Sequence, residues 1–165
     1  MGKISFRTMK QREQAEILPQ LFGILYANMS QLAPTGCSFE EDQKIWLEYI
    51  MAALHSENKQ ILLMFSDENL AGYSQFTINN DTVIIDEVEI KVRYQRTMMF
   101  YKFCQYMVNH LPKNVRWFES YVRKDNDNSI SVHESLGMKR TGENQSGTSW
   151  HYLGEIKKAS MRFRR

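Results

Sequence analysis

The stretch Val88–Phe100, which reads VEIKVRYQRTMMF, decides the fold. Its first five residues alternate apolar and charged side chains, as a half-buried strand does. From Met98 to Leu111 the apolar side chains instead recur three and four positions apart, which is typical of an amphipathic helix. Gln95–Phe100 therefore joins a strand to a helix, and the rest of the chain is interpreted around this unit.

The segments before this unit carry both helical and strand signals. Ile4–Met9 is predicted to be a strand, and Thr8 with Gln11 forms a Thr-x-x-Gln start signal for a helix that Pro19 kinks or restarts. The capping-box sequence Ser38–Glu41 predicts the start of a second helix. The strands that follow are Ile61–Phe65, Leu70–Ile78 and Thr82–Val92. Their connections are too short for crossovers, so an antiparallel meander is expected.

The segments after this unit complete the sheet. A helix lies between the long strand and the strand Val115–Val122. This connection is long enough for a right-handed parallel crossover. Ser129–Leu136 is predicted to be a short helix that ends at Gly137, and Met138–Arg140 with Ser149–Leu153 is predicted to close a hairpin. The order β-α-α-β-β-β-α-β-α-β-β predicts an α/β fold with a mixed, mostly antiparallel central sheet and helices on both faces.

Composition is that of a globular protein of one domain. The chain has 165 residues, of which 42% are hydrophobic and 24% charged. Lys157–Arg165 holds five basic residues and no acidic one, so we expect a domain over residues 1–156 and a basic tail over 157–165. Without the tail, 16 basic residues face 19 acidic ones, and this acidic balance argues against a nucleic-acid surface. No apolar run is long enough for a membrane span.

The two cysteines, Cys37 and Cys104, form neither a disulfide framework nor a zinc site, which needs more ligands. The four histidines are scattered. No metal site is expected, and the setting predicted for the protein is reducing and cytoplasmic.

The element order and its landmarks resemble the GNAT acyltransferase superfamily, most specifically from Ile61 to Met138. That family joins its fourth strand to a helix through a Gln/Arg-x-x-Gly-x-Gly/Ala loop, which corresponds here to Gln95–Phe100, with Met98 and Phe100 in place of both glycines. The family tyrosine that protonates the coenzyme A thiolate is replaced by His133. The chain therefore resembles a divergent member of the family.

The resemblance implies an N-acyltransferase that moves an acetyl group from acetyl-CoA to an amine of unknown identity, without a metal. Acetyl-CoA is then expected between the fourth and fifth strands, with its pyrophosphate on the unpaired N–H groups of the helix start. Glu87 is the expected base and His133 the expected acid. The expected acetyl-CoA-binding residues are Val88, Ile90, Val92, Gln95, Arg96, Thr97, Met98, Met99, Phe100 and Asn126.

Each of these assignments has a structural alternative. Gln95–Phe100 is also read as an ordinary helix start with Met98 and Phe100 in the core, and Asn126 as part of the loop before a helix cap. The Glu87 carboxylate has the alternative of pairing with basic side chains or with neighbouring strands. The structural alternative for His133 is an ordinary histidine that lies at the surface or is satisfied by hydrogen bonds.

The expected partner is a small-molecule or peptide amine, and homodimers are frequent in families of this kind. Two alternatives remain at the level of function: a catalytically inactive GNAT fold with a ligand-binding or regulatory role, and an interaction protein anchored by the basic tail.

Overall fold

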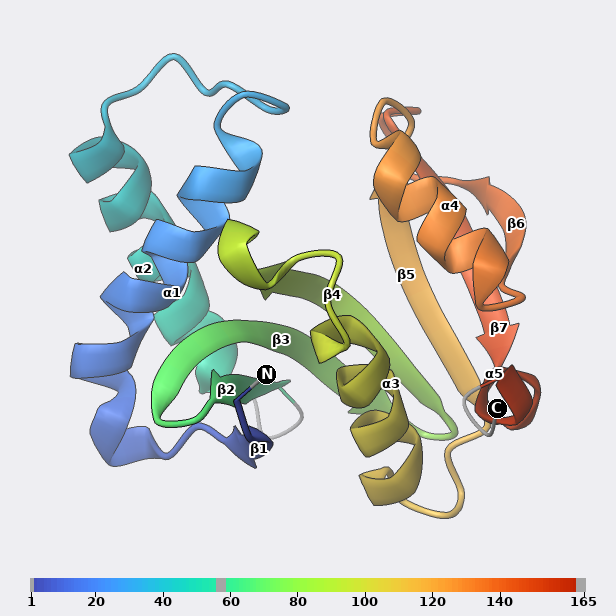
Figure 1. The fold of residues 1–165 in the computed structure, drawn as a ribbon. Helices are drawn as coiled ribbons and strands as arrows, with labels where there is room; N and C mark the ends of the chain where they lie inside the picture. Colours follow the sequence, from blue (N-terminus) through green and yellow to red (C-terminus); the bar gives the residue numbers. More distant parts are fainter. Residues whose placement is uncertain (1, 56–58, 163–165) are drawn as a thin grey trace. The chain divides into compact units, whose positions relative to one another are not determined.

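The computed structural model describes residues 2–55 and 59–162, with the side chains of 160–162 outside the description. Figure 1 shows its elements. The strands are β1 (Ile4–Thr8), β2 (Lys59–Ser66), β3 (Asn69–Asn79), β4 (Thr82–Ile90), β5 (Trp117–Arg123), β6 (Lys139–Glu143) and β7 (Ser149–Glu155). The helices are α1 (Gln14–Met29), α2 (Phe39–Leu54), α3 (Met99–His110), α4 (Asp127–Ser135) and α5 (Ile156–Arg162), with 3-10 turns η1 (Gln11–Glu13) and η2 (Val92–Tyr94).

Hydrogen bonds order the strands as β1-β2-β3-β4-β5-β7-β6 in one seven-stranded sheet. The pairs β1–β2, β5–β7 and β6–β7 are antiparallel, whereas β4 and β5 run parallel. This mixed, mostly antiparallel sheet confirms the predicted α/β fold class. The parallel pair is the one whose strands α3 connects, as the crossover rule requires.

The chain divides into two compact units, which are described here one at a time. The first unit comprises Met1–Gln75 and Glu87–Phe100, and the second comprises Phe76–Asp86 and Tyr101–Arg165. The stretch Val88–Phe100 lies wholly in the first unit.

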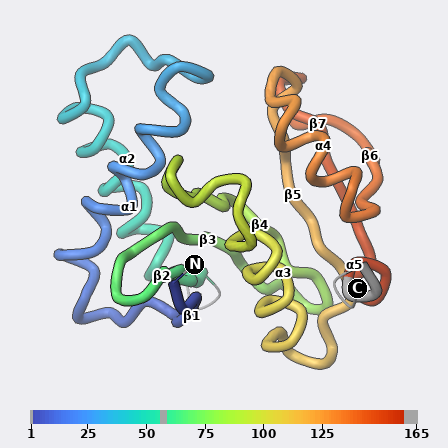
Figure 2. The backbone as a smooth tube through the Cα atoms, in the orientation of Figure 1, coloured from blue at the N-terminus to red at the C-terminus, as the bar shows by residue number. Residues whose placement is uncertain are grey.

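The core of the first unit lies where α1 and α2 pack on its strands (Figure 2). Phe22 is at its centre, with its ring centroid 5.2 Å from that of Phe39 and 5.8 Å from that of Trp46. The other buried members are Met9, Leu18, Leu21, Ile24, Ile50, Ile61, Leu63, Leu70 and Tyr73. The apolar stripes of two helices thus close over one face of the strands.

The two predicted helix starts have different outcomes. Ser38 caps α2 as predicted, because its Oγ accepts from Glu41 N–H at 3.3 Å while the Glu41 carboxylate accepts from Ser38 N–H at 2.8 Å. The start signal at Thr8 is wrong, since Thr8 ends β1. The Glu13 carboxylate instead accepts the N–H of Lys10 at 2.8 Å and both arms of the Arg7 guanidinium. These donors lower the pKa of Glu13 to about 2.

Pro19 does not interrupt the first helix, since α1 runs through it from Gln14 to Met29. The long strand is shorter than predicted: β4 ends at Ile90, and Val92 begins the turn η2. The N–H groups of Tyr94 and Gln95 bond to the carbonyls of Lys91 and Val92, and these bonds fold the chain away from the sheet. Val92 is therefore not a strand residue, and its side chain is 67% exposed.

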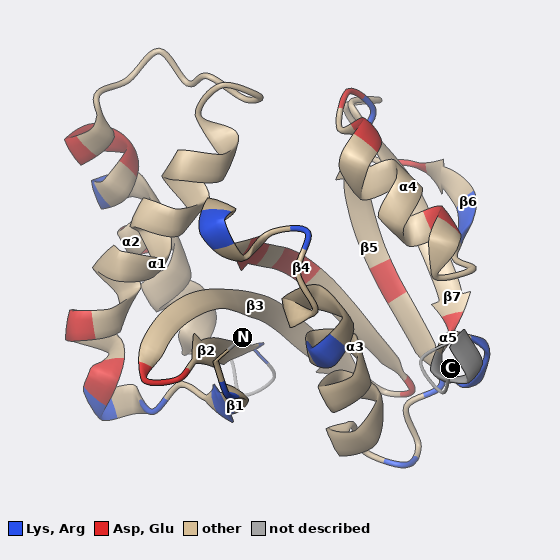
Figure 3. Cartoon of the chain, in the orientation of Figure 1, with Lys and Arg blue, Asp and Glu red and all other residues tan. Residues whose placement is uncertain are grey.

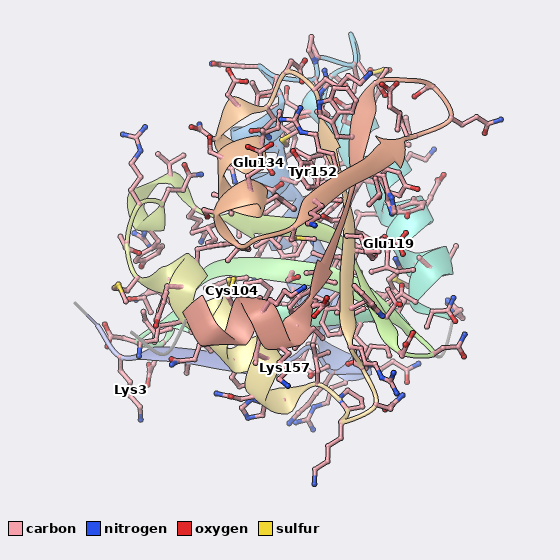
Figure 4. The ribbon with its side chains drawn as sticks, turned by 90° about the vertical axis from the view of Figure 1, so that its right-hand side faces the viewer. Lys3, Cys104, Glu119, Glu134, Tyr152 and Lys157 are labelled. Atoms are coloured by element: carbon pink, nitrogen blue, oxygen red, sulfur yellow. The ribbon has the colours of Figure 1, made fainter. Side chains whose placement is uncertain are left out.

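In the second unit, α4 packs on the strands β6 and β7. Figure 4 labels Glu134 on α4 and Tyr152 on β7, whose hydroxyl donates to the Glu134 carboxylate at 3.2 Å. Arg140 on β6 donates to both of them, at 2.6 Å to Glu134 and 2.8 Å to Tyr152. This polar cluster fixes α4 against the strands.

Part of the expected basic tail is helical. Residues 156–162 form α5, in which Ala159 is buried and Lys158 pairs with Glu155 at 2.6 Å. Arg164 and Arg165 lie outside the described residues. Within the described ranges, no helix combines the length and the apolar character that crossing a bilayer requires.

The backbones of β3 and β4 approach each other closely at Gly72. A Cβ atom there would lie 2.4 Å from the carbonyl oxygen of Glu89 and 3.0 Å from the Cα of Ile90, and both are backbone atoms that cannot swing aside. We expect Gly72→Ala to lower the free energy of unfolding by about 2 kcal/mol, the usual range for overpacking. Urea denaturation followed by circular dichroism measures this.

Gly23 provides the matched control. It lies inside α1, and a Cβ atom there would meet nothing within 4 Å. Gly23→Ala is expected to stabilise the protein by about 0.5–1 kcal/mol, because alanine is the better helix former. Equal effects of the two substitutions would contradict the close approach at Gly72.

Candidate functional site

The candidate site is the carboxyl-terminal half of β4 and the loop that connects it to α3. Figure 3 shows acidic segments on β4 followed by basic segments in the turn and loop beyond it. Residues 87–100 all belong to the first unit, so their mutual geometry is defined.

Two carboxylates lie on one face of β4. Glu87 Oε2 accepts the hydroxyl hydrogen of Tyr73 on β3 at 2.6 Å. Glu89 is two residues further on, so that a strand places it on the same face. Burial and the negative charges of both carboxylates raise the pKa of Tyr73 well above its usual value. Glu87 thus bonds to a residue of the neighbouring strand, as the structural alternative for this carboxylate expected.

Glu89 is the more unusual carboxylate. It is largely buried, and this burial raises its pKa to about 7, with a further contribution from the charge of Glu87. A hydrogen bond from Asn28 opposes the shift. A carboxylate with a near-neutral pKa is able to take a proton from an ammonium group and release it again at physiological pH.

A pair of amide side chains surrounds this carboxylate. Asn28, in the last turn of α1, donates from Nδ2 to Glu89 Oε2 at 2.7 Å and to the Ile90 carbonyl at 3.0 Å. Gln95 donates from Nε2 to the same carbonyl at 2.9 Å and to Asn28 Oδ1 at 3.2 Å. The side chain of Gln95, an expected acetyl-CoA ligand, is thus engaged within the protein.

The backbone of β4 has one edge directed away from β3. The Lys91 N–H bonds to the Ala71 carbonyl of β3, so strand alternation turns the backbone groups of Val88 and Ile90 to the other edge. The pairing of β4 with β5 covers Thr82–Ile85 of β4. The Ile90 carbonyl is occupied by the two amides, which leaves the Ile90 N–H and both Val88 groups on that edge.

At the start of α3 the fully buried side chain is that of Met99, whereas Met98 and Phe100 were the core residues of the structural alternative. Met99 is 1% exposed and Met98 is 45% exposed, so Met98 is not a core residue, while Phe100 is half-buried. Thr97 Oγ1 accepts the Met99 N–H at 3.2 Å and donates to the Tyr94 carbonyl at 2.6 Å. Arg96 has a positive φ of 56°, a conformation that favours glycine.

Two further expected residues lie in the second unit. Asn126 is the N-cap of α4, because its Oδ1 accepts the Ser129 N–H at 3.0 Å. His133 is half-buried in the last turn of α4, with its ring centroid 5.2 Å from that of Tyr152. Its Nδ1 lies 2.7 Å from the Ser129 carbonyl, which accepts, so Nδ1 carries the hydrogen. Burial lowers the pKa of His133 and favours the neutral ring.

Sequence reasoning missed Tyr73 and Asn28 as parts of this site. Neither belongs to a motif, and Asn28 is 61 residues from its partner Glu89 along the chain. Glu89 carries the same signal as Glu87, an acidic residue in a strand, and the sequence does not distinguish the two. Among the described residues, no three side chains are grouped so as to hold a metal ion.

Solved structures share this architecture. An acetyltransferase from Thermus thermophilus matches with a TM-score of 0.76 and 12% identity over 94% of this chain and 99% of its own. The PaiA N-acetyltransferase of Thermoplasma acidophilum, solved with coenzyme A, matches with a TM-score of 0.68 and 13% identity over 93% and 99%. The spermidine N-acetyltransferase of Vibrio cholerae, solved with CoA and spermine, matches with a TM-score of 0.66 and 13% identity over 94% and 97%.

These comparisons show that the chain has the fold of the GNAT acetyltransferases. No protein-family model matches its sequence, and no curated protein does so either. At 12–13% identity, the likeness is one of fold.

The raised pKa of Glu89 predicts a pH-dependent stability. The folded state holds this proton up to about pH 7, whereas an unfolded glutamate loses it near 4.5. The free energy of unfolding should therefore fall as the pH rises from about 4.5 to 7, by at most roughly 3 kcal/mol from this group. Glu89→Gln should remove this part of the slope, as urea denaturation at several pH values measures.

Glu48→Gln, on the exposed side of α2, is the matched control and should keep the wild-type slope. If Glu89→Gln and Glu48→Gln give the same profile as the wild type, Glu89 titrates normally and the description of the carboxylate is wrong.

Proposed function

We propose that this protein is an N-acyltransferase that moves an acetyl group from acetyl-CoA to a primary amine by direct attack. The observation that carries the proposal is the largely buried carboxylate of Glu89, which accepts the Asn28 amide at 2.7 Å near the end of a strand that leads into a helix start. Burial raises its pKa to about 7. The GNAT fold supports the same chemistry, since structural neighbours are acetyltransferases and two of them were solved with CoA.

The start of α3 fits a nucleotide diphosphate. The first N–H groups of a helix have no acceptor within the helix, and the positive end of its dipole favours an anion. In α3 the first of them, that of Met99, bonds to Thr97 Oγ1 at 3.2 Å, so the proposal relies on the dipole and on the rest of the first turn. Arg96 stands exposed just before this turn and adds a positive charge. Met98 is largely exposed, and its flexible side chain is able to move aside for a phosphate. These residues therefore suit the pyrophosphate of CoA.

The edge of β4 suits the pantetheine arm. Extended amides bind to a strand edge as an added strand does, through N–H and C=O groups of alternate residues. Val88 offers both groups, and Ile90 offers its N–H. The GNAT resemblance supports Asn126, in the second unit, as a further ligand of CoA. Its Oδ1 is occupied by the cap of α4, so we propose its Nδ2 as the donor. Val92 lies beyond the strand, where its exposed side chain provides an apolar contact.

The protein groups account for the protons of the reaction. Glu89 takes a proton from the acceptor ammonium, and Glu87 assists by the negative charge that raises the pKa of Glu89. Acetyl-CoA supplies the acetyl thioester. The amine nitrogen forms a bond to the carbonyl carbon and the C–S bond breaks. The nitrogen releases its second proton to solvent, and the leaving thiolate receives a proton from the charged form of His133, which becomes neutral. The lowered pKa of His133 makes its charged form a stronger acid.

The acceptor is proposed only as a class. The Vibrio cholerae neighbour was solved with spermine, and its name assigns it to spermidine. For this chain we propose a small-molecule or peptide primary amine, because a near-neutral base is needed where the nucleophile arrives as an ammonium ion.

Acetyl-CoA binding tests the nucleotide site. Isothermal titration calorimetry should show binding by the wild type. Arg96→Ala should weaken the affinity about threefold to tenfold, because a charged contact to phosphate is lost. Arg96→Lys keeps the charge and should retain most of the affinity, whereas Arg12→Ala, which removes an exposed arginine of η1, should have no effect.

An absence of binding heat, together with an unchanged melting temperature at saturating acetyl-CoA, would contradict the transferase proposal. It would favour the inactive GNAT fold.

Acetyl transfer tests the base. With a panel of primary amines and a thiol-release assay, kcat/KM should pass through a maximum as the pH rises. Glu89 must be ionised, which favours a pH above about 7, whereas His133, whose pKa is lowered by burial, must be protonated, which favours a lower pH. Glu89→Gln should lower kcat about 10²–10⁴-fold, because it removes general-base catalysis while keeping the shape. Glu48→Gln serves again as the exposed control. Full activity in Glu89→Gln would exclude Glu89 as the base.

His133→Ala tests the acid. We expect kcat to fall about tenfold or more with an unchanged KM for acetyl-CoA, because the thiolate loses its proton donor but the nucleotide keeps its contacts. Steady-state kinetics over a pH series measures both constants. A change in KM alone would show that His133 shapes the site without donating a proton.

A further inference from the structure

The two amide side chains beside Glu89 form a closed hydrogen-bonded network. Asn28 uses both Nδ2 hydrogens, one on Glu89 Oε2 and one on the Ile90 carbonyl. Gln95 uses both Nε2 hydrogens, one on that carbonyl and one on Asn28 Oδ1. The network has no donor left over, and the two acceptor positions of the Ile90 carbonyl are filled.

This network fixes which way the Asn28 amide faces. A flipped amide would direct its oxygen at the Glu89 carboxylate and at the Ile90 carbonyl, and both of these groups accept only. It would also direct its N–H group at the Gln95 N–H group. The donor of Asn28 therefore faces the carboxylate, and Gln95 is the residue that holds it there.

Asn28 acts on the ionised form of the carboxylate. The titratable groups that face Glu89 are Glu87, on the same strand, and Tyr73, on β3, whose hydroxyl is directed to Glu87. Burial and the charge of Glu87 both favour protonated Glu89, and the Asn28 hydrogen bond is the contact that favours its ionised form. Without it, a smaller fraction of the carboxyl would be ionised at neutral pH, and fewer molecules would have the base ready.

Gln95 also connects this carboxylate to the loop. It follows η2 and directly precedes Arg96, whose backbone adopts the left-handed conformation. The amide that orients Asn28 is thus part of the segment proposed to meet the pyrophosphate. The orientation of the base and the conformation of the loop depend on the same hydrogen bonds.

We infer that Asn28, held by Gln95, is a positioning residue for Glu89: its Nδ2 hydrogen bond at 2.7 Å keeps the carboxylate oriented and ionised for proton transfer. The use of this proton transfer in acetyl transfer rests on the proposed function. The effect of Asn28 on the carboxylate is measured without any substrate.

The experiment is a carbon-13 NMR titration of the glutamate side-chain carboxyl groups in the free protein, with the Glu89 signal assigned by its loss in Glu89→Gln. The wild-type signal should titrate at about 7. Asn28→Ala should raise this value by about half a unit to one unit, because one hydrogen bond to the ionised form is lost. Asn28→Asp, which keeps the shape but adds a second negative charge, should raise it by about one unit or more.

Asn114→Ala is the matched control. Asn114 also donates its side-chain amide to a carbonyl, that of Asn80 at 2.9 Å, but it lies in the second unit. It should leave the Glu89 signal unchanged. Circular dichroism verifies that each variant is folded, and the isosteric Asn28→Asp keeps the test decisive if the alanine variant does not fold.

The pH profile provides a second readout. If the pKa of the base rises by one unit from 7, Asn28→Ala should lose about fivefold in kcat/KM at pH 7 and recover nearly wild-type kcat/KM at pH 9. A merely structural role of Asn28 would lower kcat/KM equally at both pH values.

The outcomes separate the two proposals. An unchanged Glu89 titration in both Asn28 variants would overturn the inference. Shifted titrations in a protein that transfers no acetyl group to any amine would support the effect of Asn28 on Glu89 and overturn the proposed function.

Discussion

The candidate site depends on the burial of one carboxylate of β4, that of Glu89. Glu89 is largely buried and lies on the same face as Glu87, so its charge is stable only where protein donors replace water. Asn28 supplies that donor from the end of α1, and Gln95 keeps it in place. The approach of β3 at Gly72 brings the backbone of β4 close enough for Tyr73 to reach Glu87. The packing of the first unit and the acid–base properties of its carboxylates therefore arise from the same contacts.

Local signals in the sequence were sufficient for the elements. The Ser38–Glu41 capping box and the apolar stripe of α3 involve residues within a few positions of one another, and the structure contains both helices. The boundary at Val92 was missed because the two hydrogen bonds that form η2 leave no pattern in side-chain polarity. The start signal at Thr8 failed because Glu13, which is held by Arg7, competes for the nearby N–H group of Lys10.

The site itself was predicted less completely. The strand-loop-helix stretch contains Glu87, Glu89 and Gln95, so its position along the chain could be read directly. What could not be read is the contact of Asn28 with Glu89, which joins residues 61 positions apart and depends on how α1 ends. Nor does any pattern distinguish Glu89 from Glu87. Their difference lies in the partners that folding provides, a phenol hydroxyl for Glu87 and an amide for Glu89.

The loop before α3 was interpreted through a resemblance that expects glycines at Met98 and Phe100. In the structure Met98 is 45% exposed, while Met99 fills the core position. The residue with positive φ is Arg96, which adds a charge at the place where the backbone turns. Recognition of a diphosphate by backbone N–H groups requires the helix start and not particular side chains. A diphosphate site of the kind proposed would therefore tolerate extensive substitution of its side chains.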